Sequence, residues 1–194
     1  MEIELTFRPL TPETWADFEA LFGKNGACGG CWCMWWRLER SVYHAQQGEG
    51  NHAAMRALVD EGRVPGILAY ADGRAVGWCS VAPREEFSGL ARARILKPVD
   101  ETPVWSIVCF FVAKEHRRRG VTIGLIRAAV DYARKRGARA VEAYPVEPRT
   151  GKTQDAFAFT GLASAFLRAG FSEVLRRSET RPIMRYACEE PKES

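Results

Sequence analysis

The stretch Val112-Ala113-Lys114-Glu115-His116-Arg117-Arg118-Arg119-Gly120-Val121-Thr122 decides the fold. Before it, residues 104–112 form a continuous apolar run, which is typical of a strand buried on both faces of a sheet. After it, apolar residues recur at helical spacing until about Arg136, and Gly137 ends the pattern. The sequence therefore predicts a buried strand, a short basic loop and a helix in direct succession.

The arginine–glycine loop has the chemistry of an anion site. The first turn of a helix leaves backbone N–H groups unpaired and carries partial positive charge. Gly120 lets the backbone approach a ligand where a Cβ would collide, and the three arginines add charge suited to phosphate oxygens. Arginines alone would also fit a solvated helix face, but beside this glycine they favour a ligand with more than one phosphate. The dinucleotide fingerprint and the Gly-Lys-Ser/Thr motif are absent, which disfavours NAD and ATP.

The remaining elements follow from hydrophobic periodicity and turn residues. We expect strands at residues 2–8, 67–70, 74–81, 140–146, 173–177 and 183–187, helices at about 12–22, 52–61 and 157–169, and a helical turn near 34–40. This order predicts a mixed α/β (α+β) sheet with one parallel crossover, where ligands bind at the carboxyl ends of the crossover strands. We expect a single domain over residues 1–188 and a polar C-terminal tail at 189–194.

The composition is that of a globular protein. Of the 194 residues, 46% are hydrophobic and 27% are charged, as in an ordinary single domain. No apolar run approaches the roughly 18 residues that a membrane helix needs, and the acidic N-terminus is unlike a signal peptide. We therefore expect a cytoplasmic protein without a membrane partner. A compact arginine cluster and a net charge of only +4 also disfavour a nucleic-acid partner.

At the basic loop the chain resembles the GNAT superfamily of acyl-CoA-dependent N-acyltransferases. The motif of that superfamily, Arg/Gln-x-x-Gly-x-Gly/Ala, is occupied by Arg117, Gly120 and Thr122, with Thr122 a small departure. A helix that ends in Gly170-Phe171 before a strand matches the late motif of the superfamily. The resemblance implies a GNAT-like fold with splayed central parallel strands, acetyl-CoA as cosubstrate, a primary amine of a small molecule or peptide as acceptor, and a homodimer.

The resemblance also implies where acetyl-CoA binds. Backbone groups at the end of the central strand would bond the pantetheine arm and polarise the thioester carbonyl, and the glycine loop would hold the pyrophosphate. The implied cofactor-binding residues are Phe110, Phe111, Val112, Arg117, Arg118, Arg119, Gly120, Val121, Thr122 and Phe166.

Catalysis by this route is direct attack of a neutral amine on the thioester. An alkyl ammonium has a pKa of about 10.4, so a base must first remove a proton. Glu142 is our candidate base; the alternative is that it is a surface carboxylate that pairs with an arginine. Family members often protonate the thiolate with a tyrosine where this chain has Phe166, so Tyr144 and Ser164 are the candidate acids, and Ser106 could orient a water. The missing tyrosine also leaves open a non-catalytic acyl-CoA-binding module.

The segment Cys28-Gly29-Gly30-Cys31-Trp32-Cys33 is the feature that the superfamily pattern does not explain. Three close thiols could bind zinc with His44 or His52, but structural zinc sites usually need a second separated pair, so we expect no metal. A redox pair within the segment is disfavoured for lack of a thioredoxin-type context. We expect Cys33 and the tryptophans to pack as core or to line the acceptor pocket, with Arg37 or Arg40 nearby.

Overall fold

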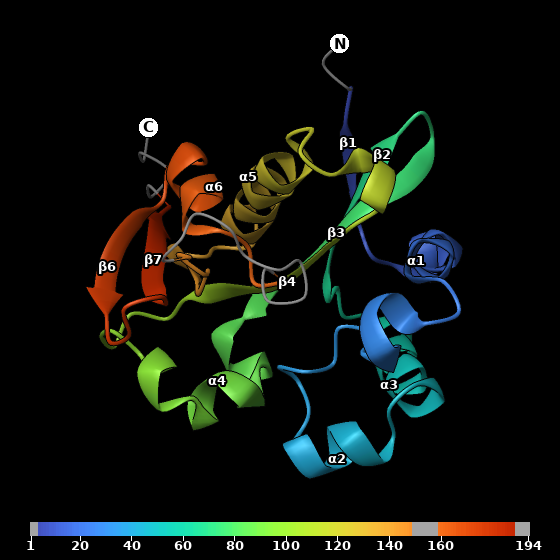
Figure 1. Cartoon of the computed structure of the whole chain (residues 1–194), viewed down its shortest axis with the longest axis horizontal. Helices are drawn as coiled ribbons and strands as arrows, with labels where there is room; N and C mark the ends of the chain where they lie inside the picture. The colour runs from blue at the N-terminus through green and yellow to red at the C-terminus, as the bar shows by residue number, and fades with distance from the viewer. Residues whose placement is uncertain (1–3, 149–158, 189–194) are drawn as a thin grey trace.

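A seven-stranded mixed sheet runs through the molecule (Figure 1). The computed structural model describes residues 4–148 and 159–188. The strands in spatial order are β1 (Thr6–Pro9), β2 (Gly66–Ala71), β3 (Arg74–Pro83), β4 (Trp105–Val112), β5 (Ala140–Ala143), β7 (Pro182–Ala187) and β6 (Ser172–Arg176). All neighbouring strands pair antiparallel except β4 and β5, which pair parallel. This is the predicted mixed sheet with one parallel crossover.

Helices cover both faces of the sheet. They are α1 (Trp15–Phe22), α2 (Arg40–Ala45), α3 (Glu49–Asp60), α4 (Ser88–Arg92), α5 (Val121–Arg134) and α6 (Ala163–Arg168). Figure 1 shows α5 and α6 on one side of the sheet and α1 to α4 on the other. Alternation along β2 agrees, because Ile67 and Ala69 join the core under α5 whereas Leu68 and Tyr70 join the core under α1 and α3. No helix within the described residues is long and apolar enough to cross a membrane.

The parallel pairing of β4 and β5 is short. It spans Trp105↔Val141 to Ile107↔Ala143, and β4 then continues for five residues without β5 beside it. On its other side β4 carries a bulge, because Ser80 and Val81 of β3 pair with Cys109 and Ile107 and leave Val108 as the extra residue. Along the second half of β4, the edge that faces β5 is therefore not paired with β5.

Several predicted boundaries differ from the structure. The strand expected at residues 140–146 ends at Ala143, shortly before Pro145, whose missing N–H cannot serve a ladder. The helix expected at 157–169 begins only at Ala163, and residues 157 and 158 lie outside the described part. In place of its first turns, Leu162 forms a parallel bridge with Val146. The sequence pattern at 159–162 predicts a helix, but the pairing of Leu162 with Val146 holds this segment in an extended conformation instead. The tail at 189–194 also lies outside the described residues.

Candidate functional site

The basic loop at the start of α5 has the predicted strand–turn–helix geometry. Gly120 has φ +82°, the left-handed region that favours glycine, and its carbonyl accepts the first helical hydrogen bond from the Gly124 N–H at 3.1 Å. An added Cβ at Gly120 would meet no atom within 4 Å, so the backbone angle, not crowding, requires glycine here. Arg117 donates from Nε to the Val112 carbonyl at 3.1 Å, which ties the loop back to β4. The loop thus presents the first turn of α5 to solvent.

The side chains of the other predicted loop residues differ in their exposure to solvent. Arg117, Arg118 and Arg119 are exposed, and Thr122 is half-buried. Val121 is buried, so only its backbone is available to a ligand. Exposed guanidinium groups around an open helix N-terminus have the charge and the donors that phosphate oxygens bind.

The open half of β4 lies directly before this loop. Phe110 is 8% exposed, and Phe111 and Val112 are half-buried. The backbone N–H of Phe110 donates to the Phe159 carbonyl at 2.6 Å. One of the backbone donors that the resemblance assigns to acetyl-CoA therefore has a partner within the protein.

Phe166 lies beneath this strand with no exposed surface. Its ring contacts Phe110 and Phe171, with ring centroids 5.9 and 5.1 Å away. Phe166 therefore supports β4 from the core, and contact with a ligand would require it to move. Its predicted role in binding acetyl-CoA stays a prediction.

A buried polar network lies on the opposite face of the β4–β5 junction. Ser106 of β4 and Glu142 of β5 are register partners, and the Tyr144 hydroxyl lies 3.0 Å from Ser106 Oγ. Tyr144 donates to Glu142 Oε2 at 3.0 Å. Three of the four residues that we predicted as catalytic are thus joined by hydrogen bonds. The fourth, Ser164, is exposed on α6 and is not among the residues joined in this network.

Two arginines that the sequence analysis missed compensate the Glu142 charge. Glu142 is only 1% exposed, and Arg185 of β7 donates to its Oε1 from Nη2 at 2.7 Å and from Nε at 3.1 Å. Arg84 hydrogen-bonds the Tyr144 hydroxyl and lies 3.8 Å from Glu142 Oε2. Arg185 is the register partner of Glu142 in the β5–β7 ladder. Only the strand pairing brings these charges together, so the sequence held no local signal for them.

The environment keeps Tyr144 protonated. Burial, followed by the Glu142 carboxylate, raises the pKa of Tyr144 above its ordinary value, and the opposing effect of Arg84 is smaller. Tyr144 is therefore a hydroxyl at neutral pH and can donate a proton. Glu142 accepts hydrogen bonds on both oxygens and is paired with Arg185, as our alternative expected, but it lies in the interior and not at the surface.

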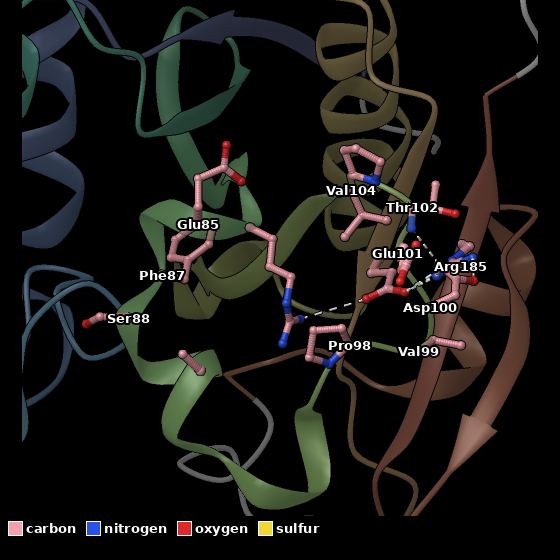
Figure 2. A pocket seen from close by; sticks show the side chains of 14 residues that line it. Glu85, Phe87, Ser88, Pro98, Val99, Asp100, Glu101, Thr102, Val104 and Arg185 are labelled. Atoms are coloured by element: carbon pink, nitrogen blue, oxygen red, sulfur yellow. Dashed lines mark hydrogen bonds and ion pairs between the residues drawn. The ribbon is translucent and has the colours of Figure 1, made fainter.

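A cavity of about 400 Å³ opens beside this network (Figure 2). Its wall carries four carboxylates and two guanidinium groups, from Glu85, Asp100, Glu101, Glu142, Arg84 and Arg185. Arg185 also holds Asp100, with Nη1–Oδ2 and Nη2–Oδ1 distances of 2.7 and 3.1 Å. Hydrogen bonds from Arg185, with a smaller contribution from the Thr102 N–H, hold the pKa of Asp100 well below its usual range. The cavity is thus negatively charged within a protein of net charge +4.

The cysteine segment forms part of a second core cluster. Trp32, Cys33 and Met34 are buried with α1 and α3, as the packing interpretation predicted, whereas Cys28 is exposed. Within the described residues no group of three or more Cys, His, Asp or Glu side chains is arranged to hold a metal ion. The segment does not line the cavity beside Glu142.

A sequence-family comparison identifies the chain's relatives. The family model described as acetyltransferase (GNAT) family matches residues 32–156, which is more than half of the chain. No curated protein matches the sequence significantly.

Solved structures share the fold at low identity. A GNAT-family acetyltransferase from Listeria monocytogenes superposes with a TM-score of 0.58 at 10% identity, over 95% of both chains. A putative acetyltransferase of Salmonella typhimurium, yncA, solved with acetyl-CoA, gives 0.54 at 13% identity over 97% of this chain and 96% of that one. The PaiA N-acetyltransferase of Thermoplasma acidophilum, in complex with coenzyme A, gives 0.53 at 12% identity over 95% and 99%.

Proposed function

We propose that this chain, which belongs to the acetyltransferase (GNAT) family, transfers an acetyl group from acetyl-CoA to a primary amine of a small molecule or peptide. The observation that carries the proposal is the succession of an open β4 edge, an arginine–glycine loop and the N-terminus of α5. Relatives of the same fold that were solved with acetyl-CoA or coenzyme A support the choice of cosubstrate.

Acetyl-CoA would be held at two places. The backbone N–H groups of the first α5 turn, with the side chains of Arg117 to Arg119, suit the pyrophosphate. The Phe110 N–H suits the thioester carbonyl, where it would also stabilise the oxyanion formed during attack. Because that N–H is bonded to Phe159 in the free protein, binding would exchange one carbonyl partner for another.

The polar network suggests a route for the proton. Glu142 would accept the proton of the attacking amine, and Tyr144 would give its hydroxyl proton to the departing CoA thiolate. The proton on Glu142 then returns to Tyr144 through the 3.0 Å hydrogen bond that joins them. Ser106 holds the Tyr144 hydroxyl in place. The net result is transfer of one proton from the amine to the thiolate, with both groups restored.

The acceptor would enter through the cavity beside Glu142. Four carboxylates against two guanidinium groups favour a cationic ligand, which a protonated amine is at neutral pH. The charge of the cavity therefore supports an amine over an alcohol or a thiol as acceptor.

One observation favours the alternative, a non-catalytic acyl-CoA-binding module. The internal bond between Phe110 and Phe159 closes the donor that an acyl carbonyl would use. In that case the protein would bind CoA through the basic loop but would not turn it over.

A single assay series separates the two functions. Acetyl-CoA should raise the melting temperature under both, because a ligand of the native state stabilises it. A screen of primary amines for release of the CoA thiol should then give turnover only for the acetyltransferase. Stabilisation without thiol release across the whole screen would favour the binding module, and no stabilisation at millimolar CoA would refute both. The cytoplasmic location and the homodimer stay predictions.

A further inference from the structure

One wall of the cavity beside Glu142 is a segment without regular secondary structure. Residues 98–103, which we call the wall segment, lie between a 3₁₀ turn at Arg94–Leu96 and the start of β4, and all of them line the cavity (Figure 2). Within the part of the chain that the structure describes, no backbone-to-backbone hydrogen bond involves any of them. The position of the wall segment therefore depends on the side chains that hold it.

Arg177 holds the wall segment at the point where the segment begins. It follows β6, the strand at the edge of the sheet, and its guanidinium donates to three backbone carbonyls. The Nη1 group donates at 3.4 Å to Ile95 and at 2.6 Å to Lys97, and Nη2 donates at 3.0 Å to Pro98. A planar guanidinium presents its N–H groups in a rigid fork, so one side chain can hold several carbonyls at once.

Two other arginines reach this wall, and both also bind the proposed proton carriers. Arg185 holds Asp100 of the wall segment and Glu142 with the same guanidinium. Arg84 donates to the carbonyl at the end of the 3₁₀ turn at 2.6 Å and also hydrogen-bonds the Tyr144 hydroxyl. Replacement of either arginine would therefore disturb the wall and the proposed chemistry together.

Arg177 separates the wall from the chemistry. Among the described residues, its hydrogen bonds go to neither Glu142 nor Tyr144, and its side chain is not one of those that line the cavity. Arg177 and the three residues whose carbonyls it binds are exposed. Water can therefore take over the hydrogen bonds that a substitution removes, and the fold should tolerate the change.

We propose that Arg177 is a positioning residue for the acceptor amine. It holds the wall segment at a fixed distance from the residues across the cavity, among them Glu85, Phe87 and Ser88 (Figure 2). The inference rests on the proposed function, in which the acceptor enters through this cavity. A wall that is already ordered spares the ligand the entropy cost of ordering it. Affinity for the acceptor should thus depend on Arg177, whereas affinity for acetyl-CoA and the chemical step should not.

Steady-state kinetics of Arg177→Gln measure the effect, with the amine that the screen for thiol release identifies. We expect the KM for the amine to rise by about tenfold, because the variant must order the wall segment each time the acceptor binds. The kcat and the KM for acetyl-CoA should stay at their wild-type values, since a change confined to one KM marks the loss of binding that substrate and transition state share. A wild-type KM for the amine would overturn the proposal.

Two further variants distinguish the position of the wall from the charge near it. Arg177→Lys keeps the charge but lacks the planar fork, so the KM for the amine should stay raised. Arg94→Gln is the matched control, because it removes the charge of an exposed arginine from the turn beside the wall segment, and it should keep the wild-type KM. Full recovery in Arg177→Lys, or an equal rise in Arg94→Gln, would assign the effect to charge and contradict the positioning role.

Hydrogen exchange of the free protein tests the wall without any substrate. The Thr102 N–H donates to Asp100 Oδ1 at 2.9 Å, so its exchange reports the order of the wall segment. Exchange at Thr102, followed by NMR, should be faster in Arg177→Gln than in the wild type and unchanged in Arg94→Gln. Wild-type exchange in Arg177→Gln would show that Arg177 does not hold the wall, whether or not the protein is a transferase. Faster exchange without thiol release from any amine would instead refute the transferase function, and with it the acceptor role, while the contact with the wall would stand.

Discussion

At the scale of single residues, the proposed chemistry depends on Tyr144 and the groups that hold it. Its hydroxyl contacts Ser106, Glu142 and Arg84 within one buried network. The superfamily's usual acid position is Phe166, but the structure offers a protonated hydroxyl from a different strand end. The role of acid therefore need not stay at one position in the sequence.

Removal of the Tyr144 hydroxyl tests this role. Tyr144→Phe should lower kcat by about 10²–10⁴ and destabilise the fold by roughly 1–3 kcal/mol, since Arg84 and Ser106 lose a buried partner. Steady-state kinetics and urea unfolding measure the two effects. Ser106→Ala is the matched control, because it removes one bond to the same hydroxyl and leaves the acid. A Tyr144→Phe enzyme with a wild-type kcat would exclude Tyr144 as the acid.

Glu142 and Arg185 should behave as a coupled pair. Arg185→Gln should cost about 3–5 kcal/mol of folding free energy, because it leaves the buried Glu142 carboxylate with only the Arg84 guanidinium, 3.8 Å away, to offset its charge. Glu142→Gln should cost less, because Arg185 keeps its ion pair with Asp100. The double variant should cost less than the sum, which a double-mutant cycle by urea unfolding measures. In kinetics, Glu142→Gln should lower kcat/KM by about 10²–10⁴, and the loss should shrink at high pH as the amine deprotonates unaided. A rate loss that does not change with pH would point to a purely structural role.

At the scale of elements, α5 offers an internal control for the phosphate loop. Gly120 and Gly137 flank its two ends with φ of +82° and +80°, and an added Cβ would meet nothing within 4 Å at either. A valine at either position costs similar backbone strain, about 1–2 kcal/mol. Gly120→Val should abolish the CoA-induced rise in melting temperature, whereas Gly137→Val should keep it. Equal CoA binding by both variants would show that the loop is misassigned.

The segment before α6 offers a second test at this scale. Gly161 has φ +84°, and an added Cβ would lie 2.8 Å from the Phe166 ring and 3.1 Å from Phe110. Gly161→Ala should displace this segment and weaken the Phe159–Phe110 bond, so acetyl-CoA should bind more tightly to a less stable protein. Calorimetric titration measures the affinity. Gly23→Ala is the control, with positive φ and open space. Unchanged or weaker binding by Gly161→Ala would mean that the segment does not compete with the ligand.

At the scale of the whole molecule, the ion pair between Asp100 and Arg185 joins the loop before β4 to β7. This pair makes the free energy of unfolding depend on pH in the acidic range. The pKa of Asp100 is lowered in the folded state, so its contribution is complete above the unfolded value of about 3.9 and is lost as pH falls through the folded value. Melting temperatures of the wild type and Asp100→Asn should therefore converge as pH falls below about 4. Glu101→Gln, which removes a charge from the same loop and keeps the pair, should show no such convergence.

The fold could be predicted from the sequence more completely than the candidate site. Strand β4, the basic loop and α5 each carry a local pattern, so their succession could be predicted. Tyr144, Glu142 and Ser106 could be selected as candidates because alternation places the first two on one face. Arg84 and Arg185 could not, because the pairing of strands brings them to Glu142 from distant positions in the sequence. The onset of α6 was missed because the bridge between Val146 and Leu162 replaces its predicted first turns.

The hydrogen bond from Phe110 to Phe159 has a consequence for product release. If acetyl-CoA binds as we propose, the Phe110 amide exchanges the Phe159 carbonyl for the thioester carbonyl, and such an exchange is nearly neutral in free energy. After transfer, free CoA has no acyl carbonyl, and the Phe159 carbonyl can take the amide back. The acetyl group should then add little to affinity, so CoA should bind about as tightly as acetyl-CoA and act as a competitive product inhibitor. An inhibition constant for CoA close to the Kd of acetyl-CoA would support this exchange. The rate of turnover in a cell would then depend on the ratio of the acetyl-CoA concentration to the CoA concentration.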